Sequence, residues 1–342
     1  MIPVSLYVIS LTFLTSYFIA NLMARSGVAD IPVDRSSHEK PVSTAGGLGV
    51  ICGLGAGFLL LSFLGLGIIF TELSVILSLC FAVAIIGLYD DLYSPSTLIK
   101  FGVFVGIILL LIDFFGPVQQ LPIGRNMLHL PYLVGVSGSL LWVFVVMNGT
   151  NFMDGANGLM GGSMMIAFLG LSMSAHMLGA PQTFWLGLVA SAAWAAFLPL
   201  NLRRKAVVFS GDIGALSAGF LFAAGVLLLT YESDVSVSIY LGAMMVLPFL
   251  ADVLLTLLWR VKSRQNLLKP HRDHLYQRAI RNGVSHIKIS LIYYGAFALC
   301  AGVALGVSMQ DQIVISTTFL AMIIISIVIY ILGCKLWQVE TV

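Results

Sequence analysis

Carboxylates and carboxamides in this 342-residue chain gather in short polar segments that interrupt long apolar runs. The richest is NGTNFMDGANGLMGG, which carries Asn148, Asn151, Asp154 and Asn157 among five glycines. The first three recur every three residues, so on a helix they would share one face. Amides with a carboxylate suit the donors and acceptors of a uracil, a ribose or a sugar. Because a plain tight turn needs only one or two such residues, the segment predicts a binding site.

Two adjacent aspartates, Asp90 and Asp91, end an apolar run in the segment GLYDDLYSPS. Neighbouring carboxylates repel each other, and keeping both ionised at a lipid boundary is costly unless a cation offsets them. Mg²⁺ together with a phosphate would supply that offset. The alternative is a solvated helix end, although a helix C-terminus disfavours negative charge.

Two further aspartates lie in or beside apolar runs. Asp212 follows Gly211 in the segment FSGDIGA, where it can either cap a helix or present a metal ion beside a phosphate. Asp252 lies about two helical turns inside the run LPFLADVLLTLLWR. An ionisable side chain at that depth is a functional candidate unless a neighbouring helix satisfies it.

Cations and histidines concentrate in two more polar segments. The first carries Arg35 and His38 ahead of Gly46 and Gly47, which either let backbone approach a phosphate or pack against another helix. The second, residues 260–287, predicts an anion-attracting surface, with a lipid-headgroup anchor as the alternative. Its candidate binding residues are Arg264, His271, Arg272 and His274.

The elements that must position these residues are apolar helices. With 59% hydrophobic and 9% charged residues, the chain has too little polar surface for a water-soluble globule of this size. Apolar runs of about 20 residues predict an all-α polytopic membrane protein of about eleven transmembrane helices, in a single integral membrane domain over residues 1–342. The predicted spans are 2–22, 47–69, 73–89, 98–116, 131–148, 158–179, 183–200, 213–230, 236–259, 288–308 and 313–334.

The basic residues predict the orientation of these spans. Placing the N-terminus outside puts every Lys and Arg except Arg125 on the inner side, and the positive-inside rule therefore favours an N-out, C-in arrangement. The site then lies in a cytoplasmic-face cleft. The loops that carry it are 23–46, 90–97, 149–157, 201–212 and 260–287.

The inventory of inner-face groups points to one kind of chemistry. No Ser/His/Asp or Cys/His nucleophile constellation stands out, and the four cysteines show no metal-binding spacing. Several carboxylates beside many cations suit Mg²⁺-dependent transfer of a phosphoryl-type group, in which a protein mainly positions anions and stabilises charge.

The order of the motifs resembles the polyprenyl-phosphate N-acetylhexosamine-1-phosphate transferases, a glycosyltransferase 4 type family. It includes phospho-N-acetylmuramoyl-pentapeptide transferase and the enzymes that start O-antigen and teichoic acid synthesis. The match runs from residue 30 to about 283, through RSSH, the aspartate pair, NxxNxxDGxxGL, FSGDIGA and HRDHLYQRAIRNG. The resemblance implies a multi-pass protein of the bacterial inner (plasma) membrane, with its active site facing the cytoplasm.

The resemblance also implies a reaction. An undecaprenyl-phosphate oxygen would attack the sugar-linked phosphorus of a UDP-N-acetylhexosamine and release UMP, initiating O-antigen or another cell-envelope polysaccharide. The implied partners are these two substrates and membrane lipid, without nucleic acid, and a homodimer is allowed. The implied cofactor is Mg²⁺, with Mn²⁺ as a substitute.

Residue roles follow from the same resemblance. Asp212 would be the main Mg²⁺ ligand, with Asp91 as a second ligand, and Asp90 and Asp91 would position or deprotonate the lipid phosphate. Asn151 and Asp154 would hold the nucleotide sugar, and the segment from His271 to His274 would clamp its diphosphate. The full predicted set of substrate-binding residues is Arg35, His38, Asn148, Asn151, Asp154, Asn157, Arg264, His271, Arg272 and His274.

Two positions depart from the family pattern. Many relatives carry a histidine where this chain has Tyr276, and several carry a basic residue at Ser36. If both face the donor, its sugar differs from plain N-acetylglucosamine. The pattern is closer to O-antigen initiating members, some of which use 6-deoxy-N-acetylhexosamines.

Two other classes of protein share some of these features. A nucleotide-sugar or lipid transporter would place polar residues in both membrane halves around a midplane site. An intramembrane prenyltransferase would carry carboxylates at three- or four-residue spacing, whereas Asp90 and Asp91 are adjacent. The one-sided distribution of polar segments favours the phosphoryl-type transferase.

Overall fold

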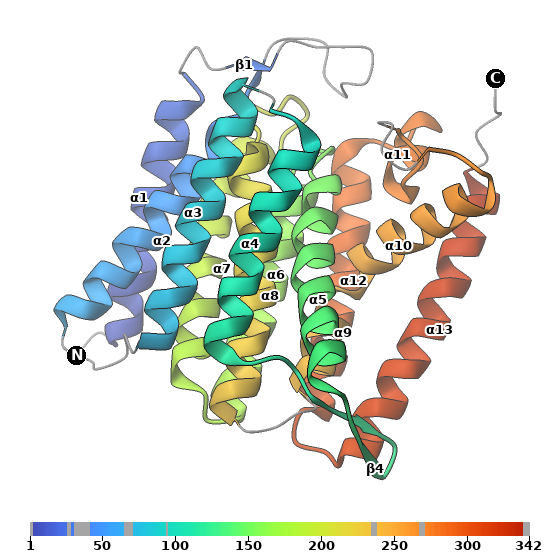
Figure 1. The fold of residues 1–342 in the computed structure, drawn as a ribbon. Helices are drawn as coiled ribbons and strands as arrows, with labels where there is room; N and C mark the ends of the chain where they lie inside the picture. Colours follow the sequence, from blue (N-terminus) through green and yellow to red (C-terminus); the bar gives the residue numbers. More distant parts are fainter. Residues whose placement is uncertain are drawn as a thin grey trace.

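The computed structural model describes residues 3–25, 29–30, 42–64, 71–93, 95–233, 238–266 and 271–337, which form an almost entirely helical bundle (Figure 1). The helices are α1 (Val4–Met23), α2 (Gly46–Phe63), α3 (Thr71–Tyr93), α4 (Thr97–Phe115), α5 (Tyr132–Phe152), α6 (Leu159–Met177), α7 (Pro181–Asn201), α8 (Gly211–Ser233), α9 (Ser238–Met245), α10 (Leu247–Lys262), α11 (Leu275–Arg281), α12 (His286–Val307) and α13 (Gln312–Leu336). Within the described ranges, ten helices are long and apolar enough to cross a membrane, and α9 with α10 makes an eleventh crossing if the bent pair counts as one span. The all-α polytopic fold is confirmed.

The predicted span 236–259 is a broken helix in the structure. α9 and α10 meet at an angle of 79°. Pro248 is the second residue of α10, a position that tolerates proline because its missing N–H would have no partner within the helix. The bend directs α10 toward α13 (Figure 1). Because the apolar run continues through the break, hydrophobicity alone did not reveal it.

Several predicted loops are shorter in the structure because helices extend into them. The last turn of α3 includes Asp90 and Asp91, and α5 continues past Asn148 and Asn151. α11 lies inside the segment 260–287 that was predicted as a loop. Two small antiparallel hairpins, β1 (Ala29–Asp30) with β2 (Val42–Ser43) and β3 (Gln120–Ile123) with β4 (Asn126–His129), were also not predicted.

Helix α8 forms the centre of the bundle (Figure 1). Every residue from Ile213 to Leu229 is buried. Glycines allow its neighbours to approach closely: a Cβ on Gly219 would lie 2.6 Å from Cα of Met147 in α5, and a Cβ on Gly87 of α3 would lie 2.7 Å from the backbone of Asp212. The first turn of α8 is therefore held directly against the last turn of α3.

Successive spans alternate in direction, so the segments with ionisable side chains meet at one end of the bundle. We call this the polar end; it contains the last turns of α3, α5 and α10, the first turns of α4 and α8, and helix α11 (Figure 1). Arg125 belongs to the β3–β4 hairpin at the opposite end. Within the described ranges, the predicted loops thus lie at a common end of the bundle.

Carboxylates satisfy the N-termini of helices other than their own at three places. The first N–H groups of a helix have no partner within it, and lipid cannot supply one. Glu232, at the end of α8, accepts hydrogen bonds from the N–H groups of Gln182 (2.9 Å) and Thr183 (2.8 Å) at the start of α7. We call Glu232, Asp91 and Asp252 trans-capping carboxylates, and the latter two are described below.

Candidate active site

A lysine joins two carboxylates at the polar end. Lys100, in the first turn of α4, donates from Nζ to Oδ2 of Asp90 and to Oδ2 of Asp212. Asp90 and Asp212 therefore share one ammonium group. The side chains of Lys100, Asp90 and Asp212 are 12%, 19% and 21% exposed, so a molecule at the membrane surface can reach them. The sequence analysis treated Lys100 only as a topology signal.

Asp91 has a different task from its neighbour. Its Oδ1 accepts the N–H of Asp212 at 3.1 Å and its Oδ2 accepts the N–H of Ile213 at 3.3 Å. Successive residues of a helix point about 100° apart, which is why Asp90 faces Lys100 while Asp91 caps α8. If Asp91 also binds a metal ion, as predicted, its two oxygens have to serve that ion as well as the two backbone N–H groups.

The FSGD segment is held in place by residues just before and at the start of α2. The N–H of Phe209 donates to the carbonyl of Ser43 at 2.7 Å, and the N–H of Gly47 donates to the carbonyl of Ser210 at 3.0 Å. A Cβ on Gly47 would lie 2.4 Å from the backbone nitrogen of Gly214. The paired glycines thus allow α2 to pack closely on α8. This packing role is the alternative to phosphate binding that the sequence left open.

Asp154 completes the acidic cluster. It follows α5, is half-buried, and accepts the hydroxyl of Ser210 at 2.6 Å. Burial raises the pKa of the Asp154 carboxyl to about 7; the charges of Asp212 and Asp91 act in the same direction, against the hydrogen bond from Ser210. We call Asp90, Asp91, Asp154, Asp212 and Lys100 the acidic cluster.

Replacing Asp154 by asparagine is expected to stabilise the protein in the absence of divalent ions. The folded-state pKa of about 7 exceeds the ordinary value of 3.8, so ionised Asp154 destabilises the fold at pH 8. This cost begins to fall as pH drops below about 7, where the folded carboxyl takes up its proton, and it is gone only below the ordinary value of 3.8. Asp154→Asn keeps an acceptor for Ser210 and should raise Tm at pH 8 by about 2–4 °C, the shift produced by about 1 kcal/mol in a chain of a few hundred residues.

The measurement is thermal unfolding in detergent with EDTA at pH 8 and pH 5. The advantage of Asp154→Asn should shrink at pH 5. Asp113→Asn, an exposed carboxylate in α4, serves as control and should leave Tm unchanged at both pH values. A lower Tm for Asp154→Asn at pH 8 would contradict the proposed electrostatic cost.

The predicted amide residues divide into structural and open ones. The side chain of Asn148 is buried and donates to the carbonyl of Phe144 at 2.9 Å, one turn earlier in α5. The Asn157 side chain is buried and donates to the carbonyl of Arg203 at 2.7 Å. Asn151 is half-buried, and its side chain forms no hydrogen bond within the described part of the chain. Of the three, Asn151 is the one free to contact a ligand.

Asn157 belongs to a clasp that joins the polar ends of α6, α7 and α12. Its own N–H donates to Nδ1 of His286 at 3.3 Å, and its carbonyl accepts the hydroxyl of Ser290 at 2.8 Å. The adjacent Gly158 donates its N–H to Oδ1 of Asn201 at 2.6 Å. The Asn-Gly density of this segment therefore serves to join helices.

The HRDH segment, His271–His274, packs between α10 and α11. Asp273 pairs with the buried Arg260, which also donates to the carbonyl of Asn266 at 2.9 Å. Burial, together with the charges of His274 and Arg260, lowers the pKa of His271 to about 4, against the opposing charges of Asp273 and Asp252. Nδ1 of His271 accepts the N–H of Asp273 at 3.3 Å, so Nε2 carries the proton. At pH 7 His271 therefore offers a neutral N–H donor.

Four predicted binding residues remain. Arg272 is half-buried in the HRDH segment, and Arg264 is exposed just after α10. Arg35 and His38 lie outside the described residues, as does Ser36.

Tyr276 is a structural residue and does not line an open site. It is 1% exposed, its hydroxyl donates to the carbonyl of Phe152 at 3.0 Å, and its ring stacks on His274. A Cβ on Gly155 would lie 2.2 Å from the Tyr276 hydroxyl oxygen. Tyr276, where many relatives carry a histidine, thus packs closely against Gly155 of the NxxNxxDG segment. Its identity therefore gives no evidence about the donor sugar.

The acidic cluster fits a hard divalent cation through the chemistry of its donors. Mg²⁺ prefers oxygen ligands and is commonly held by one or two carboxylates together with substrate phosphates. Asp90 and Asp212 present such oxygens to the same cation, at present the Lys100 ammonium. In the described part of the chain, no three His, Cys, Asp or Glu side chains form a complete metal cage, so substrate oxygens would have to complete the coordination.

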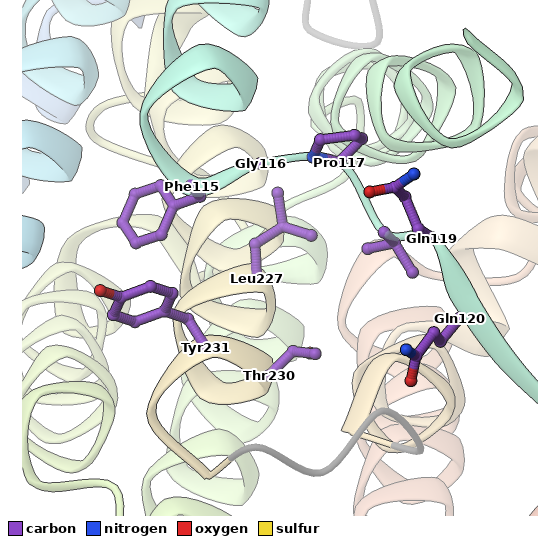
Figure 2. A pocket seen from close by; sticks show the side chains of 9 residues that line it. Phe115, Gly116, Pro117, Gln119, Gln120, Leu227, Thr230 and Tyr231 are labelled. Atoms are coloured by element: carbon purple, nitrogen blue, oxygen red, sulfur yellow. The ribbon is translucent and has the colours of Figure 1, made fainter. Parts of the chain in front are cut away.

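A shallow, open cavity lies at the opposite end of the bundle and is separate from this chemistry. It has a volume of about 290 Å³ between the end of α4, the start of β3 and the end of α8. Figure 2 shows Phe115, Gln119 and Tyr231 around it. Its lining residues carry no charge, and Phe115 is about 22 Å along α4 from Lys100.

A bundle of membrane-spanning helices that gathers Asp90, Asp212 and Lys100 at one end is an integral membrane protein with a candidate active site at the membrane surface. The sequence model described as glycosyl transferase family 4 matches residues 73–230. This range contains the whole acidic cluster. The chain is similar to this family over that range, and to polyprenyl-phosphate N-acetylglucosaminyl 1-phosphate transferases over most of its length.

Individual relatives match over most of the chain. The probable undecaprenyl-phosphate N-acetylglucosaminyl 1-phosphate transferase of Bacillus subtilis is 26% identical over 81% of this chain and 76% of its own length. The decaprenyl-phosphate N-acetylglucosaminephosphotransferase of Mycobacterium tuberculosis is 27% identical over 83% and 76%. The undecaprenyl-phosphate alpha-N-acetylglucosaminyl 1-phosphate transferase of Escherichia coli is 25% identical over 88% and 81%.

Proposed function

We propose that this protein transfers an N-acetylhexosamine-1-phosphate from a UDP-sugar to undecaprenyl phosphate, giving undecaprenyl-diphospho-N-acetylhexosamine and UMP. The observation that carries the proposal is the pair of carboxylates, Asp90 and Asp212, joined by Lys100 at one end of a membrane bundle. A surface location supports an enzyme over a transporter, whose site would lie near the midplane. The names of the relatives support the same reaction.

The reaction exchanges one phosphoanhydride bond for another. An oxygen of the lipid phosphate forms a bond to the sugar-linked phosphorus, and the bond from that phosphorus to the UMP oxygen breaks. The second pKa of a phosphate monoester is about 6, so the acceptor is already mainly dianionic at neutral pH. A strong general base is therefore not required of Asp90.

The residues of the acidic cluster have separable tasks in this proposal. Lys100 has three N–H donors; two bind Asp90 and Asp212, and the third is available to a phosphate oxygen. Asp90 and Asp212 would hold Mg²⁺, or Mn²⁺ in its place, which supplies charge neutralisation at the phosphates. Asp91 keeps α8 in position through its two backbone hydrogen bonds.

The donor would be held by the neighbouring segments. Asn151 and Asp154 lie one turn apart at the end of α5 and offer an amide and a carboxyl to the nucleotide sugar. His271 offers a neutral N–H donor to the diphosphate, alongside Arg272 and His274. The proposal names no particular sugar, because Tyr276 is buried against Gly155 and does not indicate which sugar is bound.

The proposal includes a location and an orientation. Lysines and arginines gather at the polar end, and the positive-inside rule places that end in the cytoplasm of a bacterial inner membrane. A cytoplasmic site matches the UDP-sugar, a soluble cytoplasmic type of donor. Initiation of O-antigen or another cell-envelope polysaccharide is the role we propose for the product.

The test is UMP release by detergent-purified protein supplied with undecaprenyl phosphate and a panel of UDP-N-acetylhexosamines, with Mg²⁺ or with EDTA. We expect UMP only when lipid, donor and divalent ion are all present, and the panel then identifies the sugar. Folded protein that releases no UMP with any donor, yet carries a nucleotide sugar across proteoliposomes, would replace the transferase with a transporter.

A further inference from the structure

Asp252 is buried in α10 and all of its hydrogen-bonding partners belong to the protein. Its side chain accepts the N–H of Leu275 at 2.7 Å, the N–H of Tyr276 at 3.3 Å, the hydroxyl of Tyr293 at 2.6 Å and the hydroxyl of Thr256 at 3.3 Å. The residue is 2% exposed. With both oxygens used in this way, Asp252 is not placed to bind a metal ion or a substrate itself.

The partners of Asp252 include the start of α11, directly after the HRDH segment. Leu275 and Tyr276 are the first two residues of α11, so Asp252 caps this helix as Asp91 caps α8. Nδ1 of His274 lies 3.6 Å from Oδ1 of Asp252. The position of His274 is therefore tied to that of the buried carboxylate.

The same contacts lead on to the acidic cluster. The His274 ring stacks on Phe152, with 5.9 Å between ring centres, and on Tyr276. The Tyr276 hydroxyl donates to the carbonyl of Phe152 and lies against Gly155. Because Gly155 follows Asp154 in the chain, Asp252 helps to fix the distance between the HRDH segment and the acidic cluster.

The contacts of Asp252 also extend to the last two spans, α12 and α13. Tyr293 belongs to α12, and the hydroxyl of Thr256 lies 2.9 Å from the hydroxyl of Tyr330 in α13. A single carboxylate thus connects α10, α11 and α12, and through Thr256 also α13. Because these helices meet at Asp252, this residue is placed to hold α11, the helix that it caps, in position.

We propose that Asp252 is a positioning residue that fixes α11 and His274 over the acidic cluster, so that the HRDH segment meets the diphosphate of the donor. The inference rests on the proposed function for the identity of that donor. It assigns Asp252 an effect on nucleotide-sugar binding without any contact to the nucleotide sugar.

Asp252→Asn tests this inference because asparagine has one acceptor oxygen where the carboxylate has two. We expect KM for the UDP-sugar to rise about tenfold, the equivalent of about 1.4 kcal/mol, with KM for undecaprenyl phosphate and kcat nearly unchanged. Tyr293→Phe removes one donor to the same carboxylate and should shift the same KM by a smaller factor. It carries the test if Asp252→Asn does not fold.

Glu232→Gln is the matched control. Glu232 is also a trans-capping carboxylate, but it caps α7 at the opposite end of the bundle. It should lower Tm without changing KM for the UDP-sugar. Equal effects of Asp252→Asn and Glu232→Gln on this KM would reduce Asp252 to a residue of general stability and overturn the inference.

A double-mutant cycle with His274→Ala tests whether Asp252 acts through His274. Residues that act through one another are non-additive, so the double variant should bind the UDP-sugar no more weakly than His274→Ala alone. Fully additive losses would show that Asp252 acts by another route and would overturn the inference.

Tryptic cleavage provides a readout that does not depend on the reaction. Cleavage after Arg272 and Arg278 should accelerate in Asp252→Asn and remain unchanged in Glu232→Gln, because Asp252 caps α11 whereas Glu232 caps α7. Unchanged cleavage in Asp252→Asn would overturn the inference. If cleavage accelerates but wild-type protein releases no UMP, the anchoring role stands and the proposed reaction fails.

Discussion

Asp212→Asn is expected to reduce UMP release by a factor on the order of 10³ while the protein remains folded. Asp212 is 21% exposed on its side chain and shares Lys100 with Asp90. Asparagine keeps the shape of the side chain but removes the charge that would balance a divalent cation and the ammonium group. The backbone N–H of residue 212 still reaches Asp91, so the first turn of α8 remains capped.

The measurement is the initial rate of UMP formation at saturating substrates, together with Tm in detergent. Asp113→Asn, which makes the same chemical change in an exposed position of α4, should keep the wild-type rate. A fall of less than about tenfold in Asp212→Asn would show that the charge of Asp212 is not needed in the transition state.

Gly87→Ala is expected to have the largest effect on the structure itself. A Cβ at this position would lie 2.7 Å from the backbone carbonyl carbon and oxygen of Asp212 and from the nitrogen of Ile213. Backbone atoms cannot rotate away as a side chain can, so α3 and α8 must separate. Overpacking of this kind costs about 3 kcal/mol, and the separation would also move Asp90 away from Asp212.

Gly102→Ala is the matched control, since Gly102 lies in α4 with no atom within 4 Å of the position of a new Cβ. Alanine there should leave the stability unchanged or slightly raised, because it favours the helix. The comparison requires Tm and UMP release for both variants. Wild-type behaviour of Gly87→Ala would mean that α3 and α8 do not meet as described.

The sequence predicted the features that depend on the composition of a whole span. Apolar runs predicted the spans, and the alternation of spans placed Asp90, Asp154, Asp212 and His274 at one end before any contact was known. The prediction failed at the bent span, because hydrophobicity does not change where α9 meets α10. It also ended α3 and α5 too early, since polar residues in a last turn do not stop a helix.

The division of tasks inside the site was not readable from residue types. Asp90 and Asp91 are chemically identical neighbours, and only the direction of each side chain separates the partner of Lys100 from the cap of α8. Asn157 resembles a ligand-binding amide but holds the backbone of Arg203. The need of Lys100 for an acidic partner could have been predicted from the sequence, because a lysine inside an apolar span is costly without a partner.

The trans-capping carboxylates impose an order on how the chain can assemble as it is synthesised. Synthesis runs from the N-terminus, so Asp91 already exists when α8 emerges and can cap it at once. The start of α7 must wait for Glu232, 50 residues after Gln182. Until α8 is complete, two N–H groups of α7 lack their acceptor. α7 and α8 are therefore expected to settle in the membrane as a pair, against an α3 that is already in place.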